Sequence, residues 1–231
     1  MEAVWFVIAL ALLAFAVRYL MEDRRERSPA PLHPPAHEPS PANADPADAA
    51  RDYALLKWRD GFSDEAEVLE LVREMLADEY ADIDVDAVAE QALEEAITAH
   101  QVEQMGWPEP TDCDRLDAAF AALNERGIVA RQNFSCCQNC GHAEIGAEVE
   151  EASAERPIHG YTFFHQQDTE SAAAGGGLYL AYGDETDESE SKIAVGHEIV
   201  DALRETGLDV DWNGELSRRI HVSMTWQRRR A

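Results

Sequence analysis

The chain has 231 residues, which is enough for one medium-sized domain or two small ones. Asp and Glu number 46 against 19 Lys and Arg, so the formal net charge is −27. A surface this acidic repels phosphate backbones, and we therefore expect no nucleic-acid partner. Four cysteines in a chain of this length are too few for a disulfide scaffold.

An apolar run opens the chain. Residues 3–17 are apolar without a break, and the arginines begin only at Arg18. Because this length is close to the minimum that crosses a bilayer, we predict a single transmembrane helix over residues 1–22. A cleaved signal peptide and a misread start site are the alternatives, although a signal peptide would have a basic rather than an acidic start. Arginines after the span indicate a single-pass cell-membrane protein with its N-terminus outside and its remaining chain in the cytoplasm.

A linker is expected next, over residues 23–50. It carries arginines first and then seven of the chain's ten prolines, mixed with Ala, Ser and Asp. Such a composition forms no core and favours an extended spacer. We therefore expect one folded domain over residues 51–231.

The first half of this domain, residues 51–126, has apolar residues at helical spacing. Thr111 and Asp114 form the pattern of a capping box at the start of one helix. Gly127 is suited to end that helix, because glycine adopts the left-handed conformation of a C-terminal cap.

The second half, residues 127–231, alternates between strand and helix patterns. We expect strands at residues 128–134, 161–165, 178–182, 208–212 and 220–226, and helices at residues 142–152 and 193–206. The predicted class is α+β, in which the helical half packs with a mainly antiparallel sheet of four or five strands.

The best chemical lead is a cluster of cysteines. Cys136, Cys137 and Cys140 are followed closely by His142. The spacing of Cys137 and Cys140 lets two sulfurs point at one centre, as in a zinc knuckle, and Gly141 permits the tight turn. Zinc is therefore the expected cofactor, with Cys136 and His142 as the nearest further ligands. More distant alternatives for these positions are Cys113, His159, His165 and His197.

Two other interpretations of the same cysteines stay open. Cys137 and Cys140 have the spacing of a redox pair, whose thiolate the N-terminus of a following helix would favour. Alternatively, the cysteines are small buried residues that pack a turn between a strand and a helix.

Other motifs give weaker leads. The glycine run 175–177 is not followed by the Lys and Ser or Thr of a phosphate-binding loop. His197 and Glu198 lack a second histidine, because Asp201 stands where a zinc-protease helix has one. His165 and Asp168 follow a predicted strand and are candidates for a pocket, although no paired nucleophile is visible in the sequence.

Three blocks of the chain resemble an uncharacterised bacterial family, a domain of unknown function. They are the runs 127–145, with its Cys-Cys-Gln-Asn-Cys-Gly-His segment, 160–170 and 175–183. The resemblance covers about residues 60–225 and implies a single coherent domain. It transfers no activity and no catalytic residue, but it leads us to expect that the blocks meet around one pocket.

These observations predict a membrane-tethered cytoplasmic module that binds a protein or small-molecule ligand, with a structural zinc site and no chemistry of its own. The membrane contact would run through residues 1–22. The alternative is a thiol-based or metal-dependent enzyme that uses the Cys136–His142 cluster together with His165 and Asp168.

Overall fold

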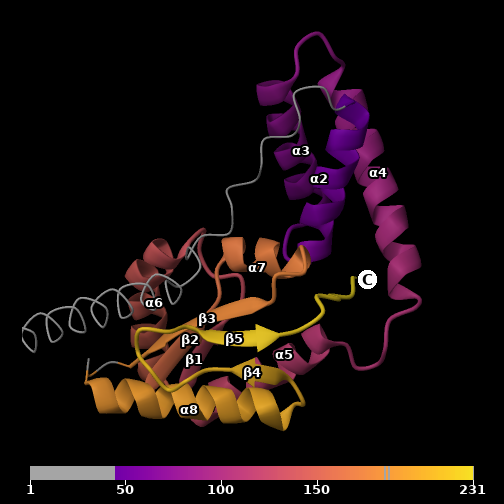
Figure 1. The fold of residues 1–231 in the computed structure, drawn as a ribbon. Helices are drawn as coiled ribbons and strands as arrows, with labels where there is room; N and C mark the ends of the chain where they lie inside the picture. The colour runs from indigo at the N-terminus through magenta and orange to yellow at the C-terminus, as the bar shows by residue number, and fades with distance from the viewer. Residues whose placement is uncertain (1–44, 185, 187, 231) are drawn as a thin grey trace, which may run out of the picture. The chain divides into compact units, whose positions relative to one another are not determined.

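A computed structural model describes residues 45–184, 186 and 188–230 (Figure 1). Three helices come first: α2 (Pro46–Asp60), α3 (Glu65–Glu79) and α4 (Val85–Gln104). They pack against one another around a shared apolar core. Its buried members are Ala50, Ala54, Trp58, Val68, Val72, Leu76, Ala89, Ala92, Leu93 and Ala96.

The α2 helix begins inside the range 23–50 that the sequence predicts to be a linker. Asp45 caps it, because its carboxylate accepts a hydrogen bond from the backbone N–H of Ala47. Pro46 occupies the first helical position, where the missing N–H costs nothing.

The second half contains a five-stranded sheet. Its elements, in chain order, are α5 (Asp112–Arg126), β1 (Ile128–Arg131), α6 (Gln138–Ser153), β2 (Gly160–Phe163), α7 (Gln166–Ala173), β3 (Leu178–Gly183), α8 (Ser189–Glu205), β4 (Asp209–Asp211) and β5 (Ile220–Ser223). The predicted capping box of α5 is confirmed, and Gly127 ends this helix with a φ of 93°.

The strand order is β1-β2-β3-β5-β4. The β1 and β2 strands are parallel, whereas each of the other neighbouring pairs is antiparallel. The class is therefore α+β with a mixed sheet: three of its four neighbouring pairs are antiparallel, and the parallel pair of β1 and β2 corrects the prediction. The physical reason is α6, which connects β1 to β2 as a crossover and so brings them into parallel register.

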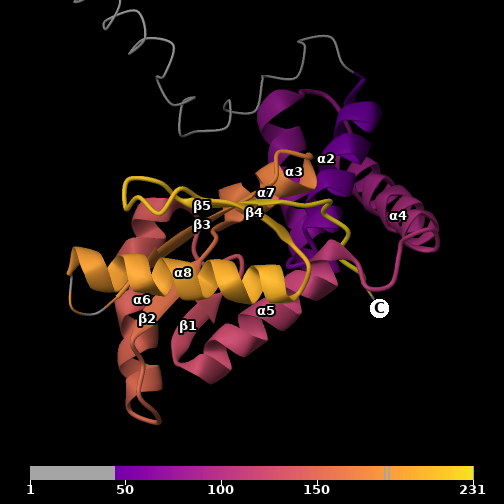
Figure 2. The ribbon, with the colours of Figure 1, turned by 60° about the horizontal axis from the view of Figure 1, so that its bottom comes forward.

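The two faces of the sheet bury different side chains. Figure 2 shows α5 and α8 side by side, and their apolar residues share a core with Ile128, Leu180 and Ile220 of the strands. The opposite face buries Val129 and Phe163 against α6. Both β1 and β2 thus alternate with the two-residue period of strands that are covered on both sides, whereas β4 leaves Asp209 and Asp211 exposed on its second face.

The structure does not support the predicted transmembrane helix, because no helix among the described residues is long and apolar enough to cross a membrane. The longest of them, α4, has 20 residues but carries five acidic side chains. The predicted span, residues 1–22, lies outside the described residues. The predicted localisation as a single-pass membrane protein depends on this span and is likewise not supported by the structure.

A C-terminal strap, residues 225–230, joins the two halves. Trp226 packs against Phe62 and Phe164, with ring centroids 6.3 and 6.1 Å apart. Its indole N–H donates a hydrogen bond of 2.9 Å to the carbonyl of Arg59 at the end of α2. Further along, the guanidinium of Arg230 lies 3.5 Å from the centre of the Trp58 ring. The strap therefore contacts the core of the first three helices and the core that the sheet shares with α5 and α8.

Candidate thiol site

The cysteine loop, residues 132–137, follows β1. Asn133 and Ser135 both have positive φ values, 49° and 62°. Residues other than glycine rarely adopt this conformation, so tertiary contacts must hold it. The first turn of α7 supplies them: Gln166 donates its N–H to the carbonyl of Ser135 at 3.1 Å, and Thr169 donates its hydroxyl to the Asn133 side chain at 2.7 Å. The cysteine block and the His165 block therefore do meet.

Three thiols gather at the end of this loop. The sulfur atoms of Cys136, Cys137 and Cys140 all lie within 4.8 Å of one another. Cys136 is exposed, and the other two are partly exposed. The interpretation of these cysteines as buried packing residues is therefore wrong. Within the described part of the chain, no other group of three or more Cys, His, Asp or Glu side chains converges in this way.

The site is built on the first turn of α6. The helix begins at Gln138 rather than at His142, so Cys137 is its N-cap residue and Cys140 lies in its first turn. Hydrogen bonding from the backbone N–H of Cys140 is the main cause that lowers the pKa of the Cys137 thiol. The neighbouring thiols of Cys136 and Cys137 raise the pKa of Cys140 to about 11. The positions of Cys137 and Cys140 in the turn therefore shift the pKa values of their thiols in opposite directions.

The structure does not bring His142 into the group of converging thiols. Its ring lies edge-on to Phe163 on β2, with centroids 5.2 Å apart. The sequence places this histidine near the cysteines, but the helix turns it toward the sheet instead.

The more distant candidates also lie outside the thiol group. Cys113 is buried in α5, where desolvation raises its pKa to about 11. His159 pairs with Glu198 at 3.1 Å, and the ring of His197 packs against Trp212.

His165 and Asp168 belong to the start of α7 rather than to the end of a strand. His165 is the N-cap residue, and its Nδ1 accepts a hydrogen bond from the backbone N–H of Asp168. Its Nε2 lies 3.0 Å from the Asp168 carboxylate. Burial lowers the pKa of this imidazole. Because both ring nitrogens contact Asp168, His165 has a structural role: it stabilises the start of α7, which in turn holds the cysteine loop.

Arg219 completes this support. It donates to both carboxylate oxygens of Asp168, at 2.9 Å to Oδ1, and also to the carbonyl of Tyr179. No local pattern singles out Arg219, which is 51 residues from its partner. The local signal for the start of α7 was Asp168, because an acidic residue three positions after a cap residue is the spacing of a capping box.

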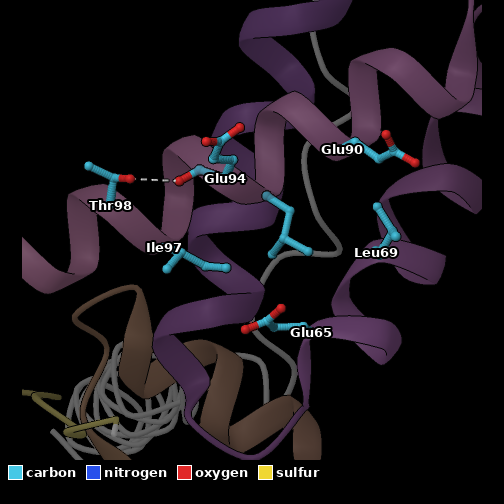
Figure 3. A pocket seen from close by; sticks show the side chains of 7 residues that line it. Glu65, Leu69, Glu90, Glu94, Ile97 and Thr98 are labelled. Carbon is cyan, nitrogen blue, oxygen red and sulfur yellow. Dashed lines mark hydrogen bonds between the residues drawn. The ribbon is translucent and has the colours of Figure 1, made fainter.

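The cavity in Figure 3 is separate from the thiols. It lies between α3 and α4 and has a volume of about 280 Å³. Its lining residues are Glu65, Leu69, Glu90, Leu93, Glu94, Ile97 and Thr98. Since it includes no residue of the three resembling blocks, it is not the pocket around which we expected them to meet.

Gly141 sets the distance between the thiol-bearing turn and the sheet. A Cβ atom at this position would overlap the ring of Phe163, which is fully buried. We expect Gly141→Ala to destabilise the domain by about 1–3 kcal/mol, because the added methyl group overpacks the core. Gly146→Ala in the same helix is the matched control, since nothing lies within 4 Å of its added Cβ.

The control should be neutral or stabilising by about 0.5–1 kcal/mol, the intrinsic helix preference for alanine. Urea unfolding of both variants measures the difference. Equal effects from the two substitutions would contradict the close approach of Gly141 to Phe163.

The fold and the site together define an α+β domain with a three-cysteine site at the N-terminus of a helix. The chain belongs to the family described as Domain of unknown function (DUF6891), whose model matches residues 43–230. The resemblance to a domain-of-unknown-function family is thereby confirmed. Searches of curated proteins and of solved structures found no match.

Proposed function

We propose that this domain is a binding module that holds a thiophilic metal ion, with zinc as the expected ion, through Cys136, Cys137 and Cys140. The supporting observation is the convergence of the three sulfurs to within 4.8 Å. In a tetrahedral zinc site with Zn–S bonds of 2.3 Å, the sulfurs stand roughly 3.8 Å apart. Small side-chain rotations would therefore close these three thiols on one ion.

The three sulfur donors limit which metal ions can bind at this site. Three thiolates suit soft or borderline cations, whereas magnesium and calcium prefer oxygen ligands. Among the described residues, no fourth Cys, His, Asp or Glu ligand atom joins the group. A four-coordinate ion would thus complete its shell with water or with a donor from a ligand, as zinc does in open sites. Such a position is a physical basis for binding a small molecule or a protein.

The test is metal content. The full chain, purified reduced and without chelator, should carry about one zinc ion, and Co²⁺ in its place should give the charge-transfer absorption of a thiolate complex. Cys137→Ser should remove most of the metal and this band. Cys113→Ser is the control, because Cys113 lies in the core of α5 and outside the cluster. A wild-type protein with neither bound zinc nor the cobalt band would refute the proposal.

The alternative of an enzyme that uses His165 and Asp168 has less support. Both ring nitrogens of His165 contact Asp168, which also pairs with Arg219, so neither nitrogen is free for proton transfer at a thiol. The chemistry that remains open to the cluster is that of the cysteines themselves.

A further inference from the structure

We infer that the metal-free thiol site performs thiol–disulfide exchange, with Cys137 as the attacking thiol, Cys140 as the resolving thiol and an accessible disulfide as substrate. The inference goes beyond the proposed metal site and does not depend on it, although a bound metal would occupy both sulfurs and block the reaction.

The position of Cys137 favours attack. It is the N-cap residue of a 16-residue helix, where backbone N–H groups of the first turn point toward the cap. Cys137 is also partly exposed, so that a disulfide in solution can reach its sulfur.

The position of Cys140 favours its attack on a mixed disulfide at Cys137. It lies three residues further in the first turn of α6, and its sulfur is within 4.8 Å of that of Cys137. A disulfide needs sulfurs about 2 Å apart and Cβ atoms about 3.8 Å apart, which rotation about the side-chain bonds of a Cys-x-x-Cys pair can reach. Adjacent Cys136 is a poorer partner for Cys137, because the peptide bond between them would have to distort.

The reaction balances without any further reagent. The Cys137 thiolate attacks one sulfur of the substrate disulfide, forms a mixed disulfide and expels one thiolate. The Cys140 sulfur, after losing its proton to solvent, attacks the Cys137 sulfur and expels the second thiolate, which takes up a proton. The substrate gains two electrons and two protons and becomes two thiols, while Cys137 and Cys140 are oxidised to a disulfide.

Oxidised glutathione added to the reduced, metal-free full chain is the probe. The wild type should lose two hydrogens and release two equivalents of glutathione. Peptide mapping should then find Cys137 linked to Cys140. Cys140→Ser should accumulate a mixed disulfide on Cys137, because its resolving thiol is missing. Cys137→Ser should slow the release of glutathione by about tenfold or more. Cys113→Ser should react like the wild type.

Two results would overturn the inference. One is a wild type that accumulates glutathione adducts without forming the Cys137–Cys140 disulfide. The other is a Cys140→Ser variant whose stable adduct lies on Cys136. Circular dichroism of each variant separates a loss of reactivity from a loss of fold, and a folded Cys137→Ser protein that reacts at the wild-type rate also contradicts the inference.

Zinc distinguishes this inference from the proposed function. Saturating zinc should slow the reaction of the wild type by about tenfold or more, because coordination removes free thiolate. Cys136→Ser, which deletes one of the proposed ligands, should raise the zinc concentration that halves the variant's own zinc-free exchange rate. Exchange in a protein that binds no zinc would refute the metal site alone, and zinc binding without exchange would refute this inference alone.

Discussion

Asp168→Asn is expected to destabilise the domain by about 3–5 kcal/mol, the cost of removing one partner of a buried ion pair. The Asp168 carboxylate accepts from the backbone N–H of His165 and from both terminal nitrogens of Arg219. Only 7% of its side chain and 16% of that of Arg219 are exposed. An amide in its place would leave the guanidinium buried without a counter-charge. Urea unfolding measures the loss.

Glu205→Gln is the control, because Glu205 also pairs with an arginine, Arg126, but at the surface. The Glu205 and Arg126 side chains are 60% and 41% exposed, so the loss of this pair should cost far less stability than the loss of the Asp168 carboxylate. A double variant, Asp168→Asn with Arg219→Met, should be more stable than the sum of the two single changes implies. Strict additivity would show that the two side chains do not act as a pair.

Trp226→Ala is expected to cost about 3 kcal/mol, at the lower end of the range for large aromatic deletions, because the side chain is only partly buried. The substitution removes ring contacts with Phe62 and Phe164 and the hydrogen bond to the carbonyl of Arg59. It therefore weakens the strap where it contacts both halves. Thermal unfolding followed by far-ultraviolet circular dichroism measures the change.

Arg229→Ala in the same strap is the control. Arg229 is exposed and pairs with Asp114 at 2.6 Å, an interaction worth at most about 1 kcal/mol at a surface. If the two strap variants lost equal stability, the anchoring role of Trp226 would be wrong.

Local signals in the sequence explain which elements could be predicted. The α5 helix is correct at both ends because Thr111, Asp114 and Gly127 are caps whose chemistry acts over a few residues. The α7 helix was missed because it has only eight residues and because histidine is an unusual N-cap. The first residues of α2, 46–50, were assigned to the linker because a proline at the first turn of a helix resembles the prolines of the preceding run.

Contacts between distant parts of the chain determine the features of the fold and site that local sequence patterns could not predict. The spacing of the cysteines correctly predicted that their thiols would converge, because the three lie in one turn. It could not predict that His142 would pack against Phe163, since that contact depends on where β2 lies. The support from Arg219 to Asp168 spans 51 residues and has no local signature. The parallel pairing of β1 and β2 likewise depends on how α6 crosses the sheet.

All three thiols of the proposed metal site come from five consecutive residues, 136–140. A chain that has lost its fold still keeps these donors within reach of one ion, so the unfolded protein would retain part of the affinity. Metal raises the free energy of unfolding only by the difference between its affinities for the two states. The site therefore stabilises the domain much less than its affinity suggests, and a newly made chain could take up its ion before the sheet has formed.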